Sequence, residues 1–264
     1  MFLSMDEHFD EHMEPDEEEI WPNEEEWPLQ RRHSFIFKFT AVVVLVAFVA
    51  LALGNVWPFF SLPSLDYIVE SYRLGRDPLI RELQEAVVQV RVETRAKNNA
   101  GLKGTGFNIK PDGLIVTNRH VVENAASVTV LFPGRAAYKA SGWSSAPVAD
   151  LAIVSLQGED LPVVSLGETL PEIGEKMTVI GNPLNFIKMV VQGDVVNYWR
   201  VSELPEPLLE IDAPVRRGSS GSPVFNGDGR AVAVIFATVE DSEGGEGRGL
   251  AVPVALLRDL WETP

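Results

Sequence analysis

The stretch from residue 86 to residue 252 is a succession of short apolar runs separated by turn residues. The run from 87 to 92 alternates and is rich in branched side chains, as a half-buried strand should be. Turn residues such as Pro111-Asp112-Gly113 and Asn226-Gly227-Asp228-Gly229 separate the runs. About a dozen short strands at this spacing predict an all-β fold built as barrels or a sandwich. The clearest predicted strands cover residues 87–92, 106–109, 114–117, 127–132, 151–156, 176–180, 190–198, 208–211, 231–236 and 250–252.

Ser220 lies in a glycine- and serine-rich stretch, Gly218-Ser219-Ser220-Gly221-Ser222-Pro223, that is typical of a tight turn. A nucleophilic serine needs such a turn, because its hydroxyl must be exposed and backbone N–H groups must face the developing oxyanion. Glycines on both sides allow the turn and let a substrate backbone approach closely. The same composition is also typical of an ordinary loop, so this stretch alone does not decide between the two.

Two upstream residues offer a base and an acid to Ser220. His120 precedes Val121-Val122, and Asp150 precedes an apolar strand. The chain order is therefore His, Asp, Ser, which is the order in chymotrypsin-like double barrels. The remaining histidines precede an apolar segment near the N-terminus, so only His120 is available within the globular region; they are His8, His12 and His33. Taken singly, a histidine or an aspartate at such a position more often has a purely structural role.

The sequence resembles the HtrA-type serine proteases over about residues 85 to 260, in several blocks that occur in the same order. The blocks are Gly104-Thr105-Gly106-Phe107, Thr117-Asn118-Arg119-His120-Val121-Val122, residues 149–154, Ile180-Gly181-Asn182-Pro183, residues 192–196, Ile211-Asp212-Ala213 and the stretch around Ser220. The surroundings of the serine depart from the family. Ser219 replaces an Asn, Ser222 replaces a Gly, and Arg216-Arg217 stand where Asn-Pro is usual.

This resemblance implies a trypsin-like double barrel of two six-stranded antiparallel β-barrels. His120 and Asp150 are then expected on the first barrel and Ser220 on the second, with the active site between them. Ser220 would be the nucleophile, His120 its general base, and Asp150 the group that orients the imidazole. The N–H groups of Gly218 and Ser220 would form the oxyanion hole. No cofactor is expected.

The resemblance also implies where the substrate side chain before the cleaved bond would lie. The residue six before the nucleophile is Pro214, which is uncharged, and Val234, Ile235 and Phe236 match the strand that lines the pocket. We predict cleavage after small or medium hydrophobic residues in extended or misfolded polypeptides. The chain contains no cysteine and no His-Glu-x-x-His run. These absences exclude cysteine-based zinc sites and a metalloprotease of that kind.

The N-terminal region has a different composition. Residues 1–30 hold twelve of the chain's 38 acidic residues and no Lys or Arg. Residues 1–34 are therefore predicted to form a disordered acidic tail. The chain has no basic stripe, which argues against a nucleic-acid partner.

Residues 35–60 are predicted to form a transmembrane helix. The uncharged run 39–60, as a helix, would span roughly 33 Å, enough for a bilayer's hydrocarbon core. Basic residues precede the run and the next one is Arg73, so the positive-inside rule places the tail in the cytoplasm and the protease domain outside a bacterial cell membrane. A cleaved signal peptide is the alternative, because Ala50-Leu51-Ala52 resembles a cleavage site.

Residues 61–85 are predicted to be a linker with short helices at 65–76 and 78–85, and residues 86–264 the protease domain, closing with a helix at 254–261. The sequence leaves no room for the PDZ domain that many HtrA relatives carry, so we expect a PDZ-less form. Relatives are commonly trimers, which makes a homotrimer an expectation here. The alternative to a protease is a catalytically silent membrane-tethered peptide-binding or sensor protein on the same fold.

Overall fold

The computed structural model describes residues 38–45, 48, 65–94, 101–134, 136–182, 188–216, 218–239 and 247–257. The chain divides into two units, Met1–Leu62 and Pro63–Pro264. In the first unit, residues 38–45 are helical. No helix among the described residues is both long and apolar enough to span a bilayer. The tail predicted over 1–34 and most of the span predicted over 39–60 lie outside the described residues, so both stay predictions.

The second unit begins with two helices, α2 (Leu65–Leu74) and α3 (Pro78–Ala86), close to the predicted ranges. Asp77 begins α3 as its N-cap, because its side chain accepts hydrogen bonds from Leu79 N at 2.8 Å and Ile80 N at 3.4 Å. Helix α3 buries Ile80, Leu83 and Ala86 in the central hydrophobic cluster. The segment predicted as a linker therefore packs into the second unit.

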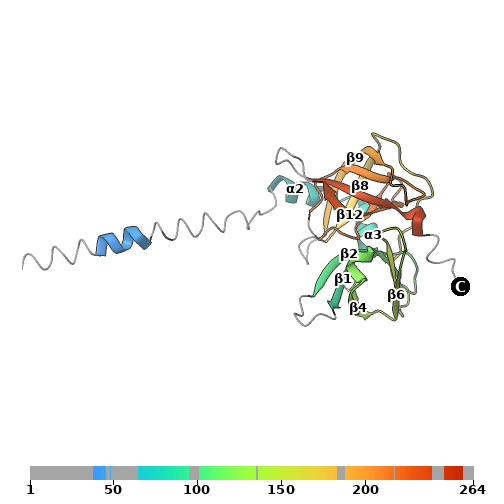
Figure 1. The fold of residues 1–264 in the computed structure, drawn as a ribbon, viewed down its shortest axis with the longest axis horizontal. Coiled ribbons are helices and arrows are strands. Elements are labelled where there is room, and N and C mark those ends of the chain that lie inside the picture. Colours follow the sequence, from blue (N-terminus) through green and yellow to red (C-terminus); the bar gives the residue numbers. More distant parts are fainter. Residues whose placement is uncertain are drawn as a thin grey trace, which may run out of the picture. The chain divides into compact units, whose positions relative to one another are not determined.

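Seven strands form the first lobe, an antiparallel sheet in the order β5-β4-β1-β2-β3-β7-β6 (Figure 1). The sheet is open, so the predicted first six-stranded barrel is wrong in this respect. Its two edge strands, β5 and β6, do not pair with each other. These two were not predicted from the sequence, since both are short and carry few branched residues. The strands are β1 (Val87–Thr94), β2 (Leu102–Asn108), β3 (Leu114–Thr117), β4 (Ala125–Leu131), β5 (Ala137–Lys139), β6 (Gly142–Ser145) and β7 (Ala152–Ser155).

Six strands form the second lobe, which is a closed barrel in the order β10-β13-β12-β11-β8-β9, as predicted. A Cβ on Gly193 would lie only 2.1 Å from the Asp212 carbonyl oxygen, so this close approach of β9 to β10 requires glycine. The strands are β8 (Lys176–Gly181), β9 (Met189–Trp199), β10 (Leu208–Asp212), β11 (Pro223–Phe225), β12 (Ala231–Val239) and β13 (Arg248–Pro253). In place of the predicted closing helix, η3 (Val254–Leu257) is a 3-10 turn, and residues 258–261 lie outside the described residues.

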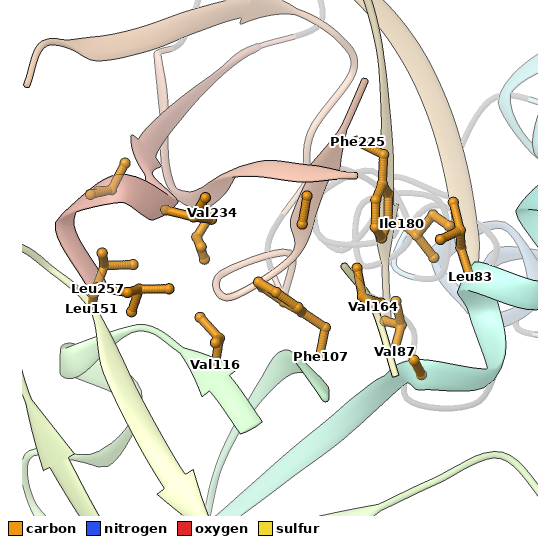
Figure 2. Close-up of a cluster of buried hydrophobic side chains, with 14 of the residues drawn as sticks. Leu83, Val87, Phe107, Val116, Leu151, Val164, Ile180, Phe225, Val234 and Leu257 are labelled. Carbon is orange, nitrogen blue, oxygen red and sulfur yellow. The ribbon is translucent and has the colours of Figure 1, made fainter. Parts of the chain in front are cut away.

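One hydrophobic cluster joins the two lobes and α3 (Figure 2). Phe107 and Val116 come from the first lobe, Phe225 and Val234 from the second, and Leu83 from α3. All five are fully or almost fully buried. Burying a side chain of this size contributes roughly 1.5–3 kcal/mol, so the lobes are held together by apolar packing close to the segments that carry the candidate site.

Candidate active site

His120 and Asp150 form a two-point hydrogen-bonded pair in the first lobe. His120 lies in the short helix α4 (Arg119–Val122), and Asp150 lies directly before Leu151 and β7. The ring Nδ1 of His120 is 2.6 Å from Asp150 Oδ2, and the backbone N–H of His120 donates to Asp150 Oδ1 at 3.0 Å. An ionised carboxylate accepts both bonds, so Nδ1 carries the ring proton and Nε2 of the neutral ring is left as an acceptor.

The backbone that carries Asp150 is fixed by the residues just before His120. Asn118 is fully buried and its Nδ2 donates to the Asp150 carbonyl oxygen at 2.8 Å. Arg119 Nη1 donates to the Pro147 carbonyl oxygen at 3.1 Å. The Thr-Asn-Arg-His segment therefore supplies the imidazole and also holds the loop that carries its partner.

The electrostatics of the pair favour the charged form of both groups. The hydrogen bond that His120 donates to the Asp150 side chain raises the pKa of His120 above its usual 6.5, although burial opposes this shift. Burial pushes the pKa of Asp150 upward, but the hydrogen bonds from the ring and backbone of His120 outweigh it and hold that pKa below 3.8. The His120 side chain is 44% exposed, so solvent reaches the ring.

Ser220 lies in the second lobe on a tight turn between β10 and β11, here called the serine turn (residues 218–222). Gly218 and Gly221 have φ values of +92° and +87°, which glycine adopts without strain. Backbone bonds close the turn, with Ser222 N donating to Ser219 O at 2.9 Å and Gly221 N donating to Ile235 O at 2.8 Å. Within the described part of the chain, the N–H groups of Gly218 and Ser220 have no hydrogen-bond acceptor.

The serine turn contacts the first lobe beside His120. Thr105 N donates to the Ser220 carbonyl oxygen at 2.9 Å. A Cβ on Gly104 would lie 3.4 Å from that same oxygen and 3.0 Å from both γ carbons of Val121, the residue after His120. The turn and the histidine segment thus pack against the same point of β2. Among the described residues, no hydrogen bond joins the His120 ring to the Ser220 hydroxyl.

The residues predicted to line a substrate pocket divide into two pairs. Val234 and Ile235 on β12 are 0% and 1% exposed, the first in the cluster between the lobes and the second inside the barrel. Pro214 and Phe236 are half-buried. Only Pro214 and Phe236 therefore keep surface through which a side chain could contact a ligand.

Two buried polar residues, one of them beside the serine turn, were not singled out from the sequence. Thr105 is fully buried and contacts the serine turn. Lys188, directly before β9, has a buried ammonium group with no hydrogen-bond acceptor among the described residues. Burial lowers the pKa of Lys188 to about 7, against the opposing effect of Glu85. Thr105 lies in a block that resembles the family, but the sequence does not indicate its role. A single lysine in an apolar run gives no sign that it is buried.

Two β lobes, a histidine–aspartate pair on the first and a glycine-flanked serine on the second define the class of trypsin-like peptidases. Residues 104–234 match the trypsin-like peptidase domain family. A probable periplasmic serine endoprotease, DegP-like, from Pseudomonas fluorescens is 32% identical over 193 residues, a match that covers 70% of this chain and 40% of that protein. The chain thus spans well under two thirds of the length of this relative.

Solved structures agree with the sequence comparison. The active form of the Rv3671c protease from M. tuberculosis has a TM-score of 0.61 and 25% identity, over 70% of this chain and 83% of that one. A serine endoprotease from Yersinia pestis has a TM-score of 0.59 and 28% identity, over 70% and 64%. The chain contains a trypsin-like peptidase domain and is a homologue of the DegP and HtrA serine proteases.

Proposed function

We propose that the protein is a serine endopeptidase in which Ser220 is the nucleophile, His120 the general base and Asp150 the group that orients the base. The observation that carries the proposal is the two-point bond between His120 and Asp150. It leaves Nε2 as the only ring nitrogen free to accept a proton, which is the state that a general base requires. The serine turn, at the same point of β2, supplies the serine.

The reaction follows from these roles. Ser220 Oγ attacks the scissile carbonyl carbon while His120 Nε2 takes the hydroxyl proton, and a tetrahedral oxyanion forms. His120 then gives this proton to the leaving amine, the C–N bond breaks, and an acyl-enzyme remains. Water attacks the ester with His120 again acting as the base, which releases the carboxyl product and restores Ser220. Asp150 stays ionised and stabilises the imidazolium throughout.

The oxyanion hole in this proposal consists of the N–H groups of Gly218 and Ser220. Both are without an acceptor among the described residues, so both are available to a substrate oxygen. Removing one such donor typically costs about 10²–10³-fold in kcat. Ser219 and Ser222, which differ from the family pattern, do not accept hydrogen bonds from these two N–H groups. Their own N–H groups bond elsewhere, Ser219 N to Arg216 O and Ser222 N to Ser219 O.

The substrates that we propose are extended or misfolded polypeptides cut after small or medium hydrophobic residues. Pro214 and Phe236 supply an uncharged, apolar surface for the side chain before the cut. The curated relative is named as a periplasmic endoprotease, which supports an extracytoplasmic protease domain for this chain. A transmembrane anchor over residues 39–60 and assembly as a homotrimer belong to the same proposal.

Labelling with a fluorophosphonate tests the proposed chemistry directly. The purified full chain should be labelled at Ser220 and should hydrolyse casein, and the Ser220→Ala variant should do neither. Labelling of another residue, or no labelling of a folded protein, would sink the proposal. A peptide library then tests the pocket, because a preference for Lys or Arg before the cut contradicts an uncharged pocket.

One observation favours a second candidate, a catalytically silent peptide-binding or sensor protein. The His120 ring and the Ser220 hydroxyl are not hydrogen-bonded to each other among the described residues. Such bonds are often long in ligand-free proteases and tighten when substrate binds. The labelling experiment separates the two candidates, because a silent protein binds extended peptides without reacting with the fluorophosphonate.

A further inference from the structure

Thr105 makes four hydrogen bonds to three separate segments although it is completely buried. Its N–H donates to the Ser220 carbonyl oxygen at 2.9 Å and its Oγ1 donates to the Gly218 carbonyl oxygen at 3.0 Å. The same Oγ1 accepts from Asn182 N, at the end of β8, at 3.2 Å. The Thr105 carbonyl oxygen accepts from Thr117 Oγ1 at 2.7 Å. Strand β2 of the first lobe thus holds the serine turn at Gly218 and at Ser220.

The two residues that Thr105 holds are the two proposed oxyanion donors. In each, the carbonyl and the N–H are separated only by the φ and ψ angles of one residue, so fixing the carbonyl restricts where the N–H points. Gly218 has no side chain to limit these angles, and its φ of +92° lies where glycine moves freely. The second lobe closes the turn by backbone bonds, but no side chain of that lobe bonds to either carbonyl oxygen among the described residues.

We propose that Thr105 is a positioning residue, whose hydroxyl sets the orientation of the oxyanion hole across the two lobes by binding the Gly218 carbonyl. This inference rests on the proposed peptidase function. Thr105 does not touch the reacting atoms, and it acts through Gly218. Its hydroxyl has one proton to donate and lone pairs to accept, so it serves Gly218 and Asn182 together. A valine of nearly the same shape serves neither and leaves the partly buried Gly218 carbonyl without this donor.

The side chain can be tested apart from the backbone. Thr105→Val and Thr105→Ser both keep the N–H that donates to Ser220 and the carbonyl that accepts from Thr117. Only the Val variant loses the bond to Gly218. Ser71→Ala is a matched control, because it removes a buried hydroxyl that accepts a backbone hydrogen bond from Val190 N, outside the network of Thr105 and the serine turn.

The experiment measures kcat and KM for peptide hydrolysis and the rate of fluorophosphonate acylation, with the full chain. We expect Thr105→Val to lower kcat and the acylation rate by about 10- to 100-fold with KM changed less than about twofold, since a small misplacement of a catalytic group has effects of this size. Thr105→Ser should restore kcat to within a few-fold of wild type. Ser71→Ala should lower the melting temperature but change kcat less than about threefold.

The pH dependence of kcat/KM is a further measurement, and it would change if the substitution loosened the fold as a whole. The apparent pKa of kcat/KM should be the same in Thr105→Val and wild type, because the bonds between His120 and Asp150 are untouched. If the Val variant does not fold, Thr105→Ala removes the hydroxyl without adding bulk and gives the same comparison.

Three outcomes would overturn the inference. They are wild-type acylation by Thr105→Val, a loss in Thr105→Ser as large as that in Thr105→Val, and a loss confined to KM. Wild-type protein that is not labelled at Ser220 refutes the proposed function instead, so the two failures are distinguishable.

Discussion

The two halves of the candidate site are built by different means. In the first lobe, the relevant side chains bond directly to one another, with His120 and Asp150 joined at two points and Asn118 holding the loop behind them. In the second lobe, the serine turn depends on glycines and backbone bonds. The lobe with the open sheet thus carries the half of the site whose side chains are fixed by hydrogen bonds within that lobe. The closed barrel carries the half that depends on hydrogen bonds from the other lobe. Closure of a barrel does not by itself order the loops at its rim.

Removing the two-point bond between His120 and Asp150 should have the largest effect on activity. Asp150→Asn lowers kcat by about 10⁴-fold under our proposal, because the amide favours the wrong imidazole tautomer while leaving the shape intact. Steady-state peptide hydrolysis measures this loss. A decrease in kcat of less than tenfold would mean that the two-point bond is not what fixes His120 in the tautomer that acts as the base.

The same variant should shift the titration of His120. The wild-type pKa of His120 lies above 6.5, chiefly through the hydrogen bond that its ring donates to Asp150, so activity is lost as the pH falls through that raised value. The bond stabilises the fold fully below pH 6.5 and less as the pH rises through the folded-state pKa. NMR of a Ser220→Ala protein with the other three histidines replaced by Gln reports His120 alone. Asp150→Asn should lower its pKa, and an unchanged value contradicts the assignment.

Breaking the second-lobe turn should have the next largest effect. A Cβ on Gly221 would lie 1.9 Å from the Thr105 carbonyl oxygen, and its φ is +87°. Gly221→Ala therefore displaces the serine turn, and we expect a loss of about 10²–10³-fold in acylation rate. Gly227→Ala is the control, because a Cβ there meets nothing within 4 Å. Equal rates in the two variants would show that the turn tolerates displacement.

A substitution of Lys188 tests whether a buried charge lowers the stability of the second lobe. Its pKa of about 7, against 10.5 in the unfolded chain, means that the unfolded state binds more protons between these values. Stability therefore rises with pH through that window, and the cost is greatest below pH 7. Lys188→Met should stabilise the protein by a few kcal/mol at pH 6, below the roughly 5 kcal/mol that the shift would give without relaxation.

Thermal unfolding at pH 6 and pH 10 measures this difference, which should fall to about a fifth at the higher pH, since 10.5 is the unfolded-state pKa. Lys176→Met is the control, because the Lys176 side chain is 64% exposed and pairs with Asp194 at the surface. Its effect should stay within about 0.5 kcal/mol. A Lys188 variant that is equally stabilised at both pH values would point to packing, not charge.

The smallest effect concerns Ser222, one of the departures from the family. Its Oγ is buried without a hydrogen-bond partner among the described residues. Ser222→Ala removes an unsatisfied hydroxyl and should raise the free energy of unfolding by about 1 kcal/mol with activity nearly unchanged. Chemical denaturation provides the measurement, and destabilisation by that amount would mean that the hydroxyl has a partner in solution.

Much of this architecture could be predicted because its signals are local. Alternating branched residues placed most strands, and the order of short blocks singled out His120 and Asp150, which the structure finds hydrogen-bonded. The open edge of the first lobe could not be predicted, because closure depends on whether β5 and β6 pair and neither has a strand-like sequence. The contacts of Thr105 were equally hidden. Those to Gly218 and Ser220 join β2 to residues more than a hundred positions away, and nothing near Thr105 indicates where its hydroxyl points.

Helix α3 sets the smallest piece of this chain that can be expected to fold. Its buried Ile80 and Leu83 lie in the cluster that binds one lobe to the other. Their burial contributes roughly 3–6 kcal/mol, comparable to the whole stability of many domains. A recombinant fragment trimmed back to the first strand would lose these contacts, so a fragment that folds on its own must include Asp77 and α3.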